Sequence, residues 1–139
     1  VFCCAKGAAI ATRTEYEAHK FMRSFDDMLP NLTAEALARD TIEEFGMECI
    51  SYDTPNGSTD VGNVSYRCPA IQPEFAIVKK HLDLHTREFA EATMSEEGHK
   101  SLLKGTEILA AICLKVIKDK DMREKIKKEF AERKASFGA

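Results

Sequence analysis

The apolar residues recur at helical spacing in three parts of the chain. Between positions 33 and 46 they follow the three- and four-residue steps of an amphipathic helix, with Thr33 as the expected N-cap and Gly46 as the expected C-terminal cap. A long helix is predicted from Ser95 to about position 117, and its broad apolar face needs another element to cover it. A last, mostly charged helix is predicted from Asp121.

Two segments have the pattern of β-strands. Thr14–Phe25 alternates in part between its two sides, and Glu74–Val78 is a short apolar run bounded by Pro and Lys. The alanine-rich opening, Val1–Ala11, is compatible with a short helix. Met47–Pro73 is crowded with Pro, Gly, Asn and Ser, which predicts a loop around one short helical turn after Asp60. Helices and strands in one chain predict a mixed fold.

Composition excludes several classes of protein. A chain of 139 residues is long enough to bury a core, and none of its apolar runs approaches the roughly 18 residues that a membrane helix needs. The net charge of -3 weighs against a nucleic-acid-binding protein. Five cysteines without a C-x-x-C pair favour reduced thiols in the cytoplasm. We therefore expect neither a membrane nor a nucleic acid as a partner.

The first candidate for chemistry is the glycine-flanked polar loop Asn56–Ser65. Gly57 lets backbone N–H groups approach an anion closely, and Ser58 and Thr59 add hydroxyl donors. No Lys follows the second Gly, so the loop is not a phosphate-binding P-loop. The alternative is a plain turn before a buried helix.

The second candidate is His85, in the loop that follows the second predicted strand. Neutral imidazole is the commonest metal ligand, and open α/β sheets place ligands beyond the carboxyl ends of their strands. A zinc site needs three or four ligands, but the spacing of His81, Cys49 and Cys68 matches no closed zinc pattern. The sequence has no recognisable nucleophile with its base. By itself the chain lacks a complete active site.

Both candidates belong to a set of segments that resembles a known family. Gly57–Ser65, Pro69–Ile77 and His85–Ala92, in this order, resemble the carboxyl-terminal part of the aminoacylase/carboxypeptidase-type di-zinc amidohydrolases. Within that family the resemblance is to the branch of the p-aminobenzoyl-glutamate hydrolases and the β-alanyl-lysine dipeptidases. Cys4–Thr12 looks like the last helix of the family's lid domain, and Asp121–Phe130 looks like the terminal helix of that branch.

The resemblance implies an α/β fold, α+β in this fragment, divided into two parts. Residues 1–30 would be the end of a ferredoxin-like lid and dimerisation domain, and residues 31–139 the carboxyl-terminal half of a three-layer di-zinc exopeptidase domain. The family's amino-terminal H-x-D motif is absent. The sequence also lacks the family's catalytic Glu-Glu pair, because its own pairs, Glu43-Glu44 and Glu96-Glu97, lie in the wrong order relative to that pair. We therefore assign no catalytic residue here, and expect the missing amino-terminal half of the same protein as a partner and a homodimer formed through the lid.

The resemblance also implies a function, the hydrolysis of amide bonds in N-acyl amino acids or dipeptides. The implied cofactor is a pair of zinc ions, with manganese or cobalt as alternatives, and His85 matches the family's last histidine ligand. Gly57, Ser58 and Thr59 match the loop that lies against the substrate, and we expect Asp60 to orient that loop or a metal ligand.

Two other functions stay open at this point. One is a non-catalytic interaction module derived from the same fold, which would dock through the helices at 95–117 and 121–130. The other is a stand-alone metal-binding domain that combines His85 with Cys49 or Cys68.

Overall fold

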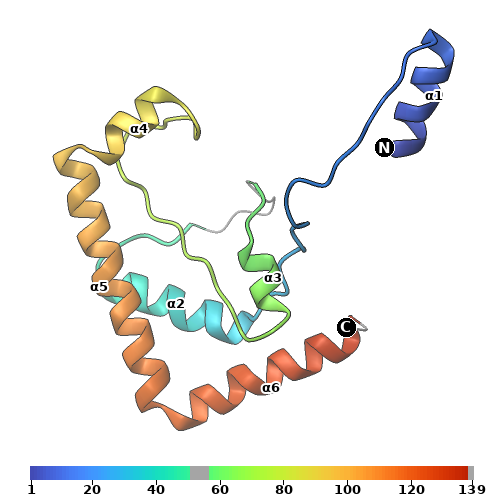
Figure 1. The fold of residues 1–139 in the computed structure, drawn as a ribbon. Helices are drawn as coiled ribbons and strands as arrows, with labels where there is room; N and C mark the ends of the chain where they lie inside the picture. The colour runs from blue at the N-terminus through green and yellow to red at the C-terminus, as the bar shows by residue number, and fades with distance from the viewer. Residues whose placement is uncertain (51–56, 138–139) are drawn as a thin grey trace.

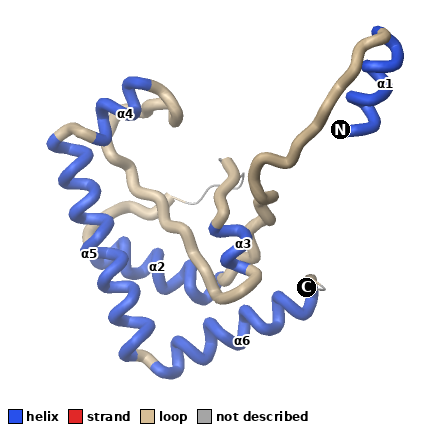
Figure 2. Tube along the Cα trace, in the orientation of Figure 1, coloured by secondary structure: helices blue, strands red, loops and turns tan. Residues whose placement is uncertain are grey.

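A computed structural model describes residues 1–50 and 57–137, and these ranges contain six helices (Figure 1). The helices are α1 (Phe2–Thr12), α2 (Leu32–Glu44), α3 (Val61–Ser65), α4 (Arg87–Thr93), α5 (Glu96–Lys118) and α6 (Lys120–Ser136). Within these ranges the chain forms no strand (Figure 2). The structure is compatible with a fragment of a larger domain, and the sheet of an α/β fold is not among the described residues.

Helices α2, α5 and α6 form the centre of the molecule. α5 and α6 meet at an angle, and α2 lies between them and packs against both (Figure 1). α4 packs on the amino-terminal part of α5. α1 stands apart at the end of an extended arm, and most of its residues are exposed (Figure 1). The chain thus has one packed body and one projecting arm.

The core consists of two small clusters that share Ile71. The first cluster is centred on Ile108, which is fully buried, and joins α2 to α5; the second is centred on Ile126 and joins α2 to α6. Phe75 packs on the first cluster and lies over Gly105, where a Cβ atom would come within 3.2 Å of the ring. The segment around Ile71 and Phe75 therefore fills the space between helices.

The start of α2 is held by two side chains. Asn31 is buried, and its amide oxygen accepts the N–H of Ala34 at 3.0 Å while its Nδ2 donates to the carbonyl of Ile126 in α6 at 2.9 Å. The carboxylate of Glu129 accepts the N–H groups of Leu32 and Thr33, both at 2.8 Å. Together these bonds satisfy three amides that the helix itself leaves without a partner.

These hydrogen bonds change the pKa of the Glu129 carboxyl group. Partial burial alone would raise the pKa of its carboxyl group, but hydrogen bonds from Thr33, Leu32 and Arg133 lower the pKa from 4.5 to about 2. The Arg133 Nε lies 2.8 Å from Oε1, on the same helix. The charged form of Glu129 is therefore tied to the contact between α2 and α6.

The two predicted strands are wrong. Thr14–Phe25 is irregular and exposed along most of its length, and Glu74–Val78 runs without regular secondary structure. A strand is stable only when a neighbouring strand accepts its backbone hydrogen bonds, and the described residues supply none. In the second segment Phe75 instead packs onto the first core cluster, between helices.

The helix predictions are largely confirmed. Ser95 caps α5 and accepts the N–H of Gly98 at 3.0 Å, Gly46 follows α2 with a φ of 76°, and a short helix follows Asp60. The N-cap of α2 is Asn31 rather than Thr33, because Glu129 serves the first two amides and lets the helix begin earlier. α4 was not predicted.

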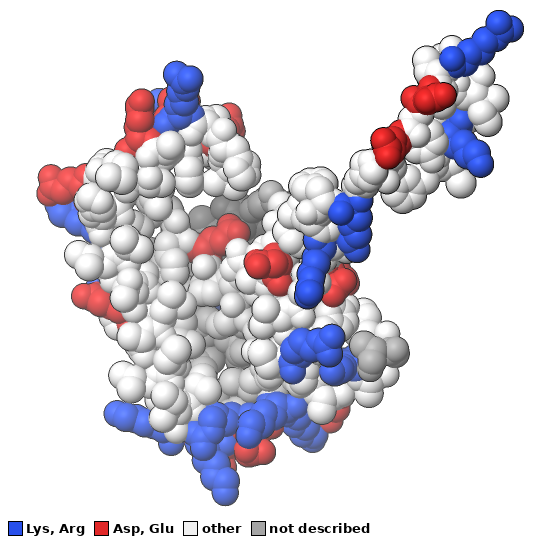
Figure 3. Space-filling model, in the orientation of Figure 1, with Lys and Arg blue, Asp and Glu red and all other residues white. Residues whose placement is uncertain are grey.

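No helix in residues 1–50 and 57–137 is long and apolar enough to cross a membrane. Lys and Arg side chains gather along the edge formed by the end of α5 and by α6 (Figure 3). On α6 they alternate with acids: Lys127 lies 3.3 Å from Glu124, and Lys128 lies 3.8 Å from Glu132. This is the solvated helix surface that the interleaved charges predict.

Candidate functional site

The polar loop forms the entry to α3. Thr59 Oγ1 accepts the N–H of Val61 at 3.3 Å, and the carbonyl of Thr59 accepts the N–H of Gly62 at 3.4 Å. Gly57 and Ser58 are exposed, and no atom of the other described residues lies within 4 Å of the place where a Cβ of Gly57 would be. Asn56 lies outside the described residues. Gly57 and Ser58 are therefore open to a ligand, whereas Thr59 already helps to build the first turn of α3.

Asp60 is the N-cap of α3, but its side chain makes no capping hydrogen bond. Its carbonyl accepts the N–H of Val64 at 3.4 Å, and the residue is exposed. The carboxylate of Asp60, which we expected to orient the loop or a metal ligand, is therefore exposed and does not cap the helix.

His85 lies in a tight turn directly before α4. Its φ is 64°, in the left-handed region that non-glycine residues adopt rarely, and its side chain is exposed. The turn is fixed by Thr86, whose hydroxyl donates to the carbonyl of Asp83 at 2.8 Å and accepts the N–H of Phe89 at 3.2 Å. Non-glycine residues in this region concentrate at functional sites, so the conformation makes His85 a stronger candidate than its sequence alone.

α4, which this turn leads into, packs on α5. At the corner between the two helices, a Cβ on Gly98 would lie 2.5 Å from the carbonyl oxygen of Ala92. Ser95 closes the corner because its hydroxyl donates to the same carbonyl at 2.6 Å. The position of His85 therefore depends on residues up to thirteen places further along the chain, for which the sequence gives no local signal.

The two candidate segments extend to the same side of the central helices. In Figure 1 the turn before α4 and the segment leading into α3 both rise from the layer of α2, α5 and α6. Among the described residues, no group of three or more His, Cys, Asp or Glu side chains is arranged to hold a metal ion. Cys49 and Cys68 therefore do not form a site with His85, and the stand-alone metal-binding domain receives no support.

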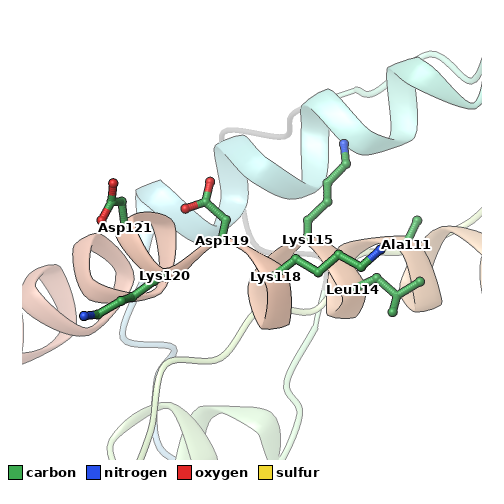
Figure 4. A pocket seen from close by; sticks show the side chains of 7 residues that line it. All are labelled: Ala111, Leu114, Lys115, Lys118, Asp119, Lys120 and Asp121. Atoms are coloured by element: carbon green, nitrogen blue, oxygen red, sulfur yellow. The ribbon is translucent and has the colours of Figure 1, made fainter.

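Two hollows on the surface of the described residues lie away from these segments. One, of about 630 Å³, sits at the corner between α5 and α6, where Lys115 and Asp119 point toward α2 and Lys118 lies along α5 (Figure 4). Lys115 is already paired with Glu44 of α2 at 2.6 Å. A second hollow, of about 520 Å³, lies between residues 76–79 and the first half of α5. Neither is lined by His85 or by residues 57–60.

Comparison with known proteins finds relatives that match most of the chain. No protein-family model matches the chain. The chain is 34% identical over 131 residues to the Xaa-Arg dipeptidases of Mus musculus and Homo sapiens. The match covers 91% of the chain, which spans only 30% of the length of each of these relatives. The similarity supports a dipeptidase/amidohydrolase family, without selecting the branch that the sequence resembles.

Proposed function

We propose that this chain is part of a dipeptidase that hydrolyses dipeptides ending in arginine or a similar cationic residue. The observation that carries the proposal is its 34% identity to Xaa-Arg dipeptidases along 91% of its length. The lack of a recognisable nucleophile and base in the sequence agrees with a fragment that contributes to an active site and does not complete it. The β-alanyl-lysine dipeptidase branch, with its cationic lysine substrate, is our narrower proposal.

We assign His85 as one ligand of a di-zinc site, with the other ligands outside this chain. The residues present do not fit a self-contained site, because the described ranges hold no group of three or more His, Cys, Asp or Glu side chains arranged for a metal ion. We therefore derive no chemical step through a metal. What this chain supplies is an imidazole on a turn that Thr86 fixes, and a loop whose Gly57, Ser58 and Thr59 donate hydrogen bonds to the substrate carboxylate. Of the two roles expected for Asp60, we propose that it orients a metal ligand, since its exposed carboxylate makes no capping hydrogen bond to the loop.

The missing partner is the rest of the same protein, and the outer face of α5 is where it packs. α5 is apolar on two sides. Ile108 and Ile112 are buried against the body, while Leu103, Leu114 and Ile117 on the side that points away from it are 66%, 52% and 67% exposed. A helix that is apolar on opposite faces is typical of a helix buried between two layers. The relatives are more than three times as long as the matched region, so they have ample chain to form the second layer.

Truncating Leu103 to alanine tests this packing. In the 139-residue chain we expect the free energy of unfolding to change by less than about 0.5 kcal/mol, because the side chain is exposed. In the longer protein the same change should cost about 2 kcal/mol, since a buried leucine is lost. Denaturant unfolding of both proteins measures the difference, with Glu107→Ala as the control on the polar edge of α5. Equal, small effects in both proteins would contradict the proposal that the rest of the protein packs on the outer face of α5.

The arm has a role in the same proposal. Residues 1–30 are the end of a lid domain and residues 31–139 belong to the catalytic domain, and the lid carries the homodimer contact. The exposed Phe2 and Ile10 of α1 support an interface there, because they leave apolar surface uncovered. All five cysteines are free thiols, which supports a reducing compartment such as the cytoplasm.

The function is tested with the longer protein purified together with its bound metal. We expect it to hydrolyse a dipeptide with a carboxyl-terminal arginine, to cleave the matched dipeptide ending in glutamate much more slowly, and to lose activity when a chelator removes zinc. Elemental analysis should find two zinc ions per chain. If the protein binds zinc and cleaves neither dipeptide, the proposed function is wrong. If it binds no metal, the alternative of a non-catalytic interaction module replaces it.

A further inference from the structure

Helix α3 is joined to the connector at residues 24–29 by a buried hydrogen bond. Ser65 is 1% exposed, and its Oγ accepts the N–H of Leu29, itself 3% exposed, at 2.8 Å. The same hydroxyl donates to the carbonyl of Gly62 at 2.6 Å. The hydroxyl thus donates within α3 and accepts from the connector, so it supplies the buried N–H of Leu29 with a partner.

Gly62 brings the two backbones into direct contact. A Cβ at this position would lie 2.0 Å from the carbonyl oxygen of Asp26 and 3.1 Å from that of Asp27. These are backbone atoms, so they cannot turn away as a flexible side chain could. Glycine is therefore required for the connector to lie this close to α3.

Two half-buried side chains, one on α3 and one directly after it, also hold the connector. Asn63 Nδ2 donates to Asp26 Oδ2 at 2.8 Å and to the carbonyl of Ser24 at 3.2 Å. The hydroxyl of Tyr66, which directly follows α3, donates to Asp27 Oδ1 at 2.9 Å. This hydrogen bond, with further contributions from desolvation and from the nearby charges, raises the pKa of Tyr66 above 10.0.

We infer that α3 locks the connector 24–29 and the segment 57–60 into one unit, so that a displacement of the arm is transmitted to Gly57, Ser58 and Thr59. The connector leads from the arm to α2, and segment 57–60 continues without a break into the first turn of α3. Five residues of helix therefore join both segments. The contacts are mainly directional hydrogen bonds and one close backbone approach, which fix an orientation as well as a distance.

The inference gives these residues a positioning role that rests on the proposed function. If segment 57–60 touches the substrate, then Asn63 and Tyr66 set the position of that segment without touching the substrate themselves. An arm that belongs to a lid would then change the substrate-binding segment whenever it moves.

Hydrogen exchange tests the lock in the 139-residue chain. Asn63→Ala combined with Tyr66→Phe removes the outer contacts and leaves Ser65 and Gly62 in place. We expect amide exchange of Leu29 and of Val61 and Gly62 to rise together by about fivefold or more, because each lost hydrogen bond weakens the closed state. Exchange of the amides in the middle of α5 should stay unchanged. Tyr16→Phe is the matched control, since Tyr16 lies in the arm.

A rise at Leu29 with unchanged exchange at Val61 and Gly62 would overturn the inference, as would no change at any of the three. Phenol absorbance adds a second readout: Asp27→Asn should lower the raised pKa of Tyr66, and an unchanged titration would show that the contact does not form. In the longer protein the double variant should raise KM for the dipeptide more than it lowers kcat. An unchanged KM would show that the lock does not affect substrate binding. Failure of the longer protein to hydrolyse any dipeptide would contradict the proposed function, and the exchange experiment would then test the lock by itself.

Discussion

Replacing His85 with alanine in the longer protein is expected to lower dipeptide hydrolysis by at least about 100-fold and to release one zinc ion, because even residues that only support a metal ligand cost 10- to 100-fold when lost. The change removes an exposed imidazole and leaves the Thr86 contacts that fix the turn. Turnover and elemental analysis of the same preparation measure the two effects.

A second substitution separates the imidazole from the backbone conformation. His85 has a φ of 64°, which glycine adopts without strain, so His85→Gly keeps the turn while it removes the ligand. Both variants should lose zinc and activity. His81→Ala is the control, since His81 is also exposed and lies four residues earlier beside Asp83. Activity retained by His85→Gly would mean that the turn, and not the imidazole, is what the enzyme requires.

Replacing Glu129 with alanine in the 139-residue chain should lower the free energy of unfolding by about 3 kcal/mol, because charge-assisted hydrogen bonds to the start of a helix are lost together. The amides of Leu32 and Thr33 would lose their partner in α6, and Arg133 would lose its carboxylate. Denaturant unfolding measures the change. Glu132→Ala is the control, since that acid lies on the same helix with its side chain 66% exposed. An equal effect of both substitutions would contradict the assigned role.

The same carboxylate gives the chain a defined sensitivity to acid. Its pKa is about 2 in the folded chain and 4.5 in the reference state, so the unfolded chain binds the proton more readily and stability falls as pH falls. The contribution of Glu129 is fully present above about pH 4.5 and is lost as the pH approaches about 2. The difference in stability between the native chain and Glu129→Gln should therefore shrink across this interval. A difference that stays constant from pH 6 to pH 2 would show that protonation is not the cause.

The sequence predicts those parts of the fold that local rules decide. A helix carries its own hydrogen bonds and caps, so the long helix after Ser95 and the end of the helix at Gly46 could be predicted from spacing and residue type. The predicted strands at 14–25 and 74–78 failed for the opposite reason, because a strand depends on a partner elsewhere. The N-cap Asn31 was missed since it is selected by Glu129, almost a hundred residues away.

The candidate site also has features that the local sequence predicts and features that it does not. Gly57, Ser58 and His85 could be selected from residue type and from the resemblance, and the structure shows them exposed on the surface. The left-handed conformation of His85 and the contacts of Tyr66 to the connector arise from tertiary packing, and nothing in their local sequence predicts them. For the close contact at Gly62 the sequence offers one signal, a glycine inside a polar loop. It does not show that the contact partner is the backbone of Asp26.

The buried amide of Asn31 also decides which covalent modifications this fold can carry. Asn31-Leu32-Thr33 and Asn63-Val64-Ser65 are both Asn-x-Ser/Thr acceptor tripeptides for N-linked glycans. In each the nitrogen that would receive the sugar already donates a hydrogen bond, to Ile126 in α6 or to Asp26 in the connector. A glycan on the buried Asn31 would separate α2 from α6, so glycosylation at Asn31 and the fold described here exclude each other. Asn63 is only half-buried, and a glycosylated Asn63 would keep one N–H for its hydrogen bond to Asp26.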